Sequence, residues 1–269
     1  MTHPPISSPD NPLIKEYLRL KRSRKYRRSA GKLAVEGPNL LEQALAAGLL
    51  PEAVIYTVDY GCGKGAPLLS ALPGSVKQVQ VSKPLFAKLT ATETPQEVAA
   101  LIPFQEPDHA QFFSVPLSLA LFLDRLQDPG NMGTVLRTAA AAGAEAVFYS
   151  PGSADPFSAK VLRSTAGAIF NIPVAMAREP LKLLREFKRA GIQIAAAAPS
   201  AQHYYWSADF SRPTLFIIGN EKGGISPELS AAADISVNIP LTGGQGSLNA
   251  AVAAAVLIFE AIRQRRSGS

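Results

Sequence analysis

Polar and glycine residues cluster directly after three predicted strands in the C-terminal half of the chain, at 123–139, 216–225 and 239–250. Ligands of open α/β sheets bind beyond the carboxyl ends of the strands. These clusters therefore predict one composite ligand site. Three of their side chains could do chemistry, an amide, a guanidinium and a carboxylate: Asn131, Arg137 and Glu221.

Each cluster alone has a simpler structural explanation. A glycine-rich turn after a strand is usually only a turn. Asn131 and Ser247 stand at predicted helix N-caps, where a side-chain oxygen accepts a backbone hydrogen bond. Arg137, predicted to face inward along an alanine-rich helix, could be a structural ion-pair partner of Glu221. Only the occurrence of all three clusters together, in this order, is specific enough to indicate a functional site.

Other chemistries lack their signatures. The sequence has no G-x-G-x-x-G after a strand, no Walker A loop and no G-x-S-x-G turn. Its histidines, His3, His109 and His203, lack metal-ligand spacing, so neither a zinc site nor a Ser–His–Asp triad is predicted. A single cysteine, Cys62, excludes an internal disulfide and favours a reducing, cytoplasmic location. No apolar run reaches the roughly 18 residues that span a bilayer, so no membrane partner is expected.

Positive charge is concentrated near the N-terminus. The net charge is +6, and residues 15–32 hold nine Lys or Arg against one acid, Glu16. Such a stripe attracts a polyphosphate backbone through Coulomb energy and counterion release. The alternative is a solvated helix face or a disordered arm. The candidate RNA contacts in this run are Lys21, Arg22, Arg24, Lys25, Arg27 and Arg28.

The elements that must position these residues fall into two α/β domains. Residues 1–106 are predicted to form a small domain led by the basic segment, with helices at 39–47 and 83–89 and strands at 53–57, 76–82 and 98–102. A linker follows at 107–116. Residues 117–269 alternate strands with helices, which predicts a parallel sheet covered on both faces. The predicted strands are 117–123, 146–149, 192–196, 214–218 and 235–239, and the predicted helices 133–142, 157–165, 180–189 and 248–265.

The last of these helices is apolar on all sides. One stripe at spacings of three and four contains Leu248, Val252, Val256, Phe259 and Ile262, and the opposite side is rich in alanine. A helix that is apolar all round is buried on both sides. Since its alanines would let another helix approach closely, we expect a homodimer.

The three clusters together resemble the three motifs of the SpoU/TrmH family, within the SPOUT class of RNA methyltransferases. The resemblance covers about 117–262 and rests on QDPGNMG at 127–133, GNE at 219–221 and SLN at 247–249, with 163–168 similar to an intervening segment. Residues 35–41 and 94–96 resemble a ribosomal-protein-like substrate-binding domain. Two positions depart from the common pattern of the family. Gly246 precedes Ser247 where a larger residue is usual, and Glu97 follows Gln96 where glycine is usual.

This resemblance implies a fold and an activity. The fold is a C-terminal α/β trefoil-knot domain with a parallel sheet, whose knotted loops bind S-adenosylmethionine, and the active site is shared between the chains of a dimer. The activity is methyl transfer to a ribose 2′-hydroxyl of RNA. Ribosomal RNA is the first expected substrate and tRNA the second. A non-catalytic RNA-binding or ribosome-assembly factor on the same fold, a small-molecule enzyme and methylation of a base stay open as alternatives.

The resemblance also implies roles for particular residues. Cofactor binding is expected at Gly219, Asn220, Ile239, Pro240 and Leu248. Arg137 is expected to be the central catalytic residue, gripping the target phosphate or the developing alkoxide, because guanidinium stays protonated. Glu221 is expected to orient Arg137 or take the proton. Asn131, Ser247 and Asn249 are expected to place the ribose and the loops. Arg163 is expected to contact RNA together with the basic run.

Overall fold

The computed structural model describes residues 4–90, 95–114, 116–243 and 246–267. The chain forms two compact units, Met1–Gln105 with Phe157–Phe170, and Glu106–Pro156 with Asn171–Ser269. These units differ from the predicted division in one segment, Phe157–Phe170, which packs with the N-terminal residues. The predicted domain boundaries themselves stay a prediction.

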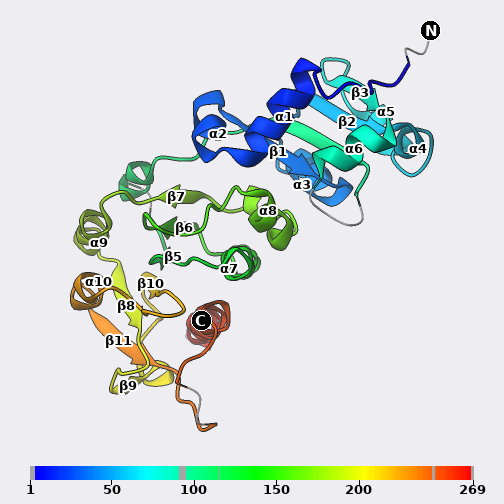
Figure 1. The fold of residues 1–269 in the computed structure, drawn as a ribbon. Coiled ribbons are helices and arrows are strands. Elements are labelled where there is room, and N and C mark those ends of the chain that lie inside the picture. The colour runs from blue at the N-terminus through cyan, green and yellow to red at the C-terminus, as the bar shows by residue number, and fades with distance from the viewer. Residues whose placement is uncertain (1–3, 91–94, 115, 244–245, 268–269) are drawn as a thin grey trace. The chain divides into compact units, whose positions relative to one another are not determined.

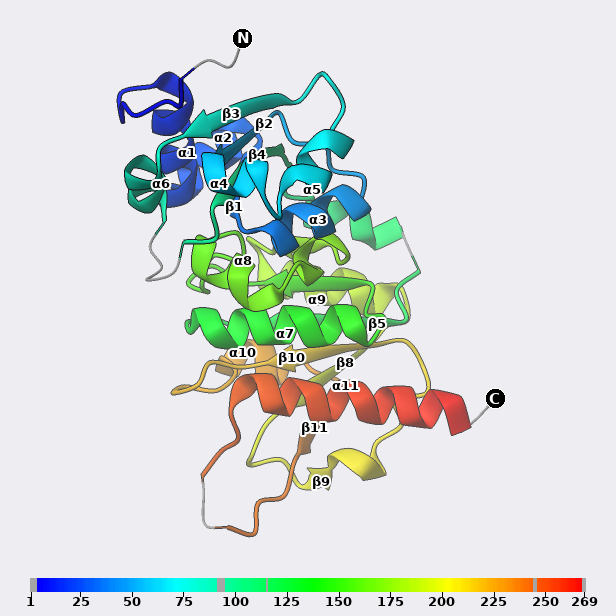
Figure 2. The ribbon, with the colours of Figure 1, turned by 90° about the vertical axis from the view of Figure 1, so that its right-hand side faces the viewer.

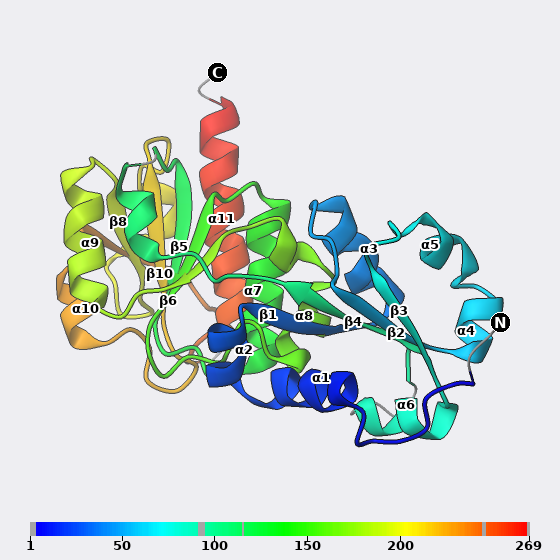
Figure 3. The same cartoon turned by 90° about the horizontal axis from the view of Figure 1, so that it is seen from above.

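The first unit is built on a four-stranded sheet in the order β1-β4-β2-β3 (Figure 1). Only β2 and β3 are parallel, and the other neighbours are antiparallel. Helices α1 and α6 lie on one face of this sheet and α3 on the other (Figure 3). The bounds are β1 Lys32–Glu36, β2 Ala53–Thr57, β3 Lys77–Val81, β4 Val98–Pro103, α1 Pro12–Arg22, α2 Arg24–Ala30, α3 Pro38–Ala46, α4 Val58–Cys62, α5 Ala66–Ala71, α6 Lys83–Leu89 and α8 Ala159–Thr165.

The basic run is folded into this unit as helices α1 and α2. Ile14, Tyr17 and Leu20 are fully buried from α1, because positions three apart share one face of a helix. The hydroxyl of Ser23 accepts a hydrogen bond from the Tyr26 amide and begins α2. The alternative of a disordered arm is therefore wrong. Removing this segment would expose the core of the first unit.

The second unit is built on a seven-stranded parallel sheet in the order β7-β6-β5-β10-β8-β11-β9. Strand order reverses at β5, where parallel sheets offer a crevice at the carboxyl ends of the strands. The sequence analysis missed β7 and β9, which are too short to show periodicity. The bounds are β5 Leu119–Leu123, β6 Ala146–Tyr149, β7 Val174–Met176, β8 Gln193–Ala197, β9 His203–Tyr204, β10 Thr214–Ile218 and β11 Ile235–Asn238.

Helices cover both faces of this sheet (Figure 3). Helices α9 (Pro180–Arg189) and α10 (Pro227–Ala231) lie on one face, and α7 (Pro129–Ala141) and α11 (Ala250–Ser267) lie side by side on the other (Figure 2). The predicted parallel α/β fold is confirmed. The expected trefoil knot stays a prediction.

The two faces of α11 have different environments. Ala254, Leu257 and Ile258 are fully buried against the unit. On the opposite face, Val252 is 49% exposed and Phe259 53% exposed. Only one of the two apolar sides is therefore covered within the chain.

Candidate active site

The first turn of α7 carries Asn131. The helix begins at Pro129, and the Asp128 carboxylate is its N-cap, accepting a hydrogen bond of 2.7 Å from the Asn131 amide. The prediction that Asn131 is the N-cap was therefore wrong. Because Asp128 takes the capping role, the Asn131 side chain is available for other partners.

A chain of side-chain hydrogen bonds joins the three sequence clusters. Asn131 Nδ2 donates to Glu221 Oε1 at 2.9 Å, and Asn249 Nδ2 donates to Asn131 Oδ1 at 2.8 Å. Asn249 Oδ1 in turn accepts from the amides of Ala251 and Val252 at the start of α11. Residues far apart in the sequence thus meet at one place, as the clusters predicted.

Glu221 is held through one of its two oxygens. Oε1 accepts from Asn131 and from the Asp128 amide, at 2.9 and 3.4 Å. Oε2 accepts no hydrogen bond from the described part of the chain, and Glu221 is exposed to solvent. The carboxylate therefore has a fixed position and one free acceptor oxygen.

The end of β5 is anchored by Asp124, to which the sequence analysis assigned no role. Its carboxylate is buried, and it accepts hydrogen bonds from the Ser226 amide at 2.8 Å and the Ser150 hydroxyl at 3.1 Å. These bonds tie the turn after β5 to the loop after β10 and to the end of β6. A charged residue directly after a wholly apolar strand was the signal that could have revealed it.

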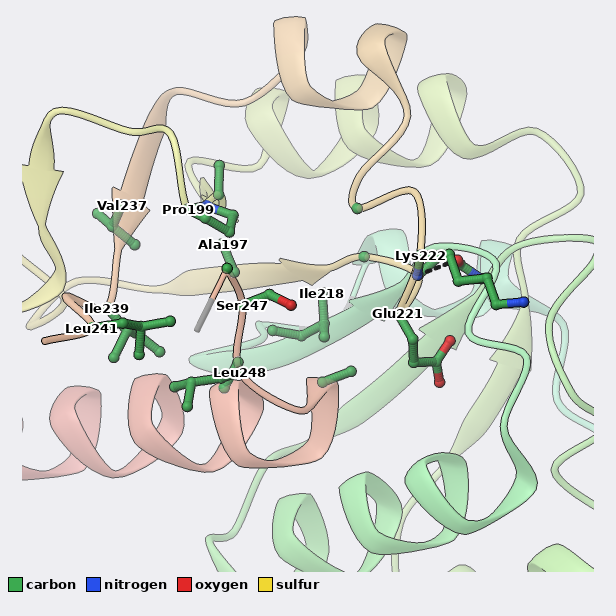
Figure 4. Close-up of a pocket in the computed structure, with 17 residues that line it drawn as sticks. Ala197, Pro199, Ile218, Glu221, Lys222, Val237, Ile239, Leu241, Ser247 and Leu248 are labelled. Atoms are coloured by element: carbon green, nitrogen blue, oxygen red, sulfur yellow. Dashed lines mark hydrogen bonds between the residues drawn. The ribbon is translucent and has the colours of Figure 1, made fainter. Parts of the chain in front are cut away.

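A cavity of about 320 Å³ opens beside this network, between the ends of β8, β10 and β11 and the start of α11 (Figure 4). That volume is at the lower end of the range for small-molecule sites, and such sites combine an apolar wall with a few polar groups. One side of this cavity is apolar, and Glu221 and Ser247 contribute oxygen atoms. The apolar lining includes Ala197, Pro199, Ile218, Val237, Ile239, Leu241 and Leu248.

Gly219 allows two stretches of backbone to approach each other at this cavity. A Cβ at Gly219 would lie 2.3 Å from Gly224 C and 2.4 Å from Ile225 N. No real Cβ contact is this short, and a backbone neighbour cannot rotate away. The turn after β10 therefore requires glycine at this position.

The structure brings most of the predicted cofactor residues together. Gly219, Asn220, Ile239 and Leu248 all line the cavity. Pro240 is exposed and lies outside the lining, because alternate residues of an extended segment point to opposite sides, and its cofactor contact stays a prediction. Sequence reasoning missed Lys222 and residues 197–199, which also line the cavity.

Arg137 does not reach this site within one chain. It is exposed on α7, outside the cavity lining, so the prediction that it faces inward was wrong. No ion pair joins it to Glu221 among the described residues. Six residues of helix place Arg137 on a different side of α7 from Asn131.

Two residues of the basic run serve the fold. The Lys21 ammonium, 11% exposed, pairs with Glu36 at 3.0 Å and donates to Leu89 O at 2.6 Å. Arg27, 6% exposed, donates to Leu20 O at 2.6 Å. Burial and these internal bonds give both residues a structural role, and their predicted contact with RNA stays a prediction.

The other predicted RNA contacts differ in exposure. Arg22, Lys25 and Arg28 are exposed, and Arg24 is half-buried. Arg163 is half-buried near Tyr17, its Nη1 has no hydrogen-bond partner in the described structure, and that atom is inaccessible. Burial raises the pKa of the Tyr17 phenol, and the nearby Arg163 charge opposes this shift.

Among the described residues, no group of three or more His, Cys, Asp or Glu side chains could hold a metal ion. No helix among them is long and apolar enough to cross a bilayer.

Comparison with known proteins agrees with this geometry. Residues 118–259 match the SpoU rRNA Methylase family, and residues 11–100 match the MRM3-like substrate binding domain. An uncharacterized tRNA/rRNA methyltransferase of Synechocystis sp. is 37% identical, over 98% of this chain and 95% of the relative. The 23S rRNA (guanosine(2553)-2′-O)-methyltransferase RlmP of Bacillus subtilis is 34% identical, over 94% of this chain and 97% of the relative. The SpoU methyltransferase AviRb from Streptomyces viridochromogenes, solved with the cofactor AdoMet, superposes with a TM-score of 0.87 at 30% identity, over 96% of this chain and all of that one.

Proposed function

Since the chain belongs to the SpoU rRNA methylase family, we propose that it transfers a methyl group from S-adenosylmethionine to the 2′-hydroxyl of a ribose in ribosomal RNA. The observation that carries this proposal is the meeting of Asn131, Glu221 and Asn249 beside the cavity. Two relatives are named as 23S rRNA 2′-O-methyltransferases, which favours ribosomal RNA over tRNA. Action on ribosomal RNA agrees with a cytoplasmic location.

The cavity fits S-adenosylmethionine on its own chemistry. Ile239, Leu241 and Leu248 offer an apolar wall for a flat adenine ring, and the close backbone approach at Gly219 leaves main-chain groups within reach of a ligand. When bound, S-adenosylmethionine supplies an electrophilic methyl group. The protein must then orient a ribose hydroxyl, which is a poor nucleophile, and remove its proton.

Glu221 is the proposed proton acceptor. Its Oε2 is free to accept the proton of the 2′-hydroxyl, while Asn131 and the Asp128 amide fix Oε1. Asn249 acts through Asn131 as a positioning residue. Ser247, with its hydroxyl at the cavity, is proposed to place the ribose.

Direct mapping of the product tests this function. Ribosomal RNA from cells with and without the gene is compared by sequencing of 2′-O-methyl sites. We expect one or a few ribose positions to lose methylation when the protein is absent. Unchanged ribose methylation throughout ribosomal RNA, with a site lost in tRNA, would contradict the proposed substrate. No S-adenosylmethionine binding in calorimetry would favour a non-catalytic assembly factor.

We also propose that the protein is a homodimer joined through the outer face of α11. The apolar side chains of Val252 and Phe259 are half exposed there, and α7 with the exposed Arg137 lies beside it. Apolar side chains on one continuous helix face favour burial against a second copy. In this arrangement Arg137 acts in the site of the other chain, gripping the target phosphate or the developing alkoxide.

Phe259→Glu tests the dimer. A charge buried at the centre of an apolar interface is costly, so we expect a monomer by light scattering, with methyl transfer reduced at least about 100-fold and S-adenosylmethionine binding retained. Leu181→Glu, at an exposed leucine of α9, is the matched control and should remain dimeric and active. A fully active Phe259→Glu monomer would rule out a shared site.

The exposed cations of α1 and α2 are proposed to contact RNA. Arg22→Gln with Lys25→Gln should weaken binding of ribosomal RNA and lower the slope of log K against log salt by about 1 to 2. The slope falls because RNA binding releases fewer counterions when the protein makes fewer phosphate contacts. Binding of S-adenosylmethionine should be unchanged. The control, Lys182→Gln with Arg185→Gln, removes two exposed cations from α9. Equal slopes for both double variants would contradict a specific role of this face.

A further inference from the structure

Two cations at the carboxyl edge of the second unit's sheet have no role in the mechanism above. Arg125 follows β5 and Asp124, with its side chain 46% exposed. Lys222 lies in the loop after β10, is exposed, and borders the cavity. Both lie in the loops that carry the catalytic groups.

The backbone of Arg125 is held in an unfavourable conformation. Its φ of +51° is in the left-handed region, where non-glycine residues are rare. The Arg125 amide donates to Ser150 Oγ at 2.8 Å, and its carbonyl accepts from Asn220 Nδ2 at 2.6 Å. Strain of this kind persists where neighbours fix the backbone from both sides, and it is concentrated at functional sites.

The same Asn220 side chain fixes Lys222. Asn220 Oδ1 accepts from the amides of Lys222 at 2.9 Å and Gly223 at 3.1 Å. Asn220 and Gly224 also exchange two backbone hydrogen bonds of 2.9 Å. One amide side chain therefore braces the backbone of both cationic residues.

The charged ends of these residues are available to a ligand. The Lys222 side chain points away from the cavity, while its backbone is bonded to Asn220 (Figure 4). Within the described structure its ammonium has no ion-pair partner. The Arg125 guanidinium makes one polar contact within the described structure, 3.4 Å to Asp124, whose carboxylate already accepts from Ser226 and Ser150.

The charges around Arg125 and Lys222 indicate which kind of ligand these two cations would help to bind. Asp124, Asp128 and Glu221 are the acids of these loops. Asp124 is satisfied internally and Asp128 caps α7, but the charge of Glu221 would repel an anion that approached it. An RNA strand places phosphates next to every ribose hydroxyl. Cations beside Glu221 would offset this repulsion.

We propose that Arg125 and Lys222 bind a backbone phosphate of the RNA strand that carries the target ribose. This inference rests on the proposed function. The phosphate contact fixes the strand so that the ribose hydroxyl lies at Glu221, and it carries no base specificity. Asn220 is the residue that positions both cations.

The test uses deproteinised ribosomal RNA from cells that lack the protein. Lys222→Gln and Arg125→Asn each remove a charge, and asparagine tolerates the left-handed backbone. We expect each variant to weaken RNA binding about tenfold and to lower the salt slope, measured by filter retention, by about 0.7. The Kd of S-adenosylmethionine, measured by calorimetry, should change less than about twofold because Lys222 points out of the cavity.

Matched variants separate charge from folding. Arg125→Lys keeps the charge and should keep the wild-type salt slope, while Arg185→Gln on α9 removes a distant exposed cation and should change nothing. A double variant with wild-type RNA affinity and slope would overturn the proposal. So would a weakened Kd for S-adenosylmethionine with unchanged RNA binding, since the cations would then hold the cofactor carboxylate.

Filter retention requires no turnover, so the two proposals fail differently. If the wild-type protein transfers no methyl group to this RNA, the proposed substrate is wrong. The salt slopes of the variants still decide whether these cations hold a phosphate. If methylation occurs and the slopes are equal, only the phosphate inference is wrong.

Discussion

Glu221→Gln should reduce kcat about 100- to 10,000-fold, because glutamine cannot accept a proton at neutral pH. The change preserves shape. A glutamine oxygen can still accept from Asn131 and the Asp128 amide, as Glu221 Oε1 does at 2.9 and 3.4 Å. The positions of α7 and of the loop after β10 should therefore be retained. Single-turnover methylation of ribosomal RNA, at saturating RNA and cofactor, measures the effect on the chemical step.

The control for this variant is Glu228→Gln, which removes an exposed carboxylate from α10. It should leave kcat within about twofold, since surface substitutions rarely act at a distance. The Kd of S-adenosylmethionine should be the same for both variants. A Glu221→Gln enzyme with a kcat near that of the wild type would mean that another group accepts the proton.

Gly219→Ala should weaken S-adenosylmethionine binding by at least about 100-fold, because close-packed backbone cannot absorb a clash of this size. The new methyl group would lie 2.3 Å from Gly224 C and 2.7 Å from Gly224 O. Relief requires displacement of the loop after β10, which carries Asn220 and Glu221. Calorimetric titration measures the lost affinity, and thermal unfolding shows that the remainder of the fold is retained.

Gly223→Ala is a matched control from the same loop. An added Cβ at Gly223 meets no atom within 4 Å, so this variant should bind the cofactor within about twofold of the wild type. If Gly219→Ala also bound normally, the cavity beside β10 would not be the cofactor site. The same result would remove the support for the proposed roles of Ile239 and Leu248.

The sequence alone determined the fold class and predicted that the three clusters would meet. Strands such as β2 and β10 and helix α9 agree with their predicted bounds, because hydrophobic runs and caps act over a few neighbouring residues. The three clusters were predicted from their place after buried strands. Parallel strands present their carboxyl ends at one edge, so the meeting of the clusters follows from topology.

Only the tertiary structure decided the role of each side chain. Asp128 proved to be the cap of α7, which leaves Asn131 to bond Glu221. Lys21 and Arg27 proved to be internal, because their partners are a distant strand residue and a helix end. Whether a polar residue caps a helix, supports a neighbouring side chain or takes part in the reaction depends on partners that lie roughly 100 residues away in the sequence. Periodicity within one helix or strand carries no information about such partners.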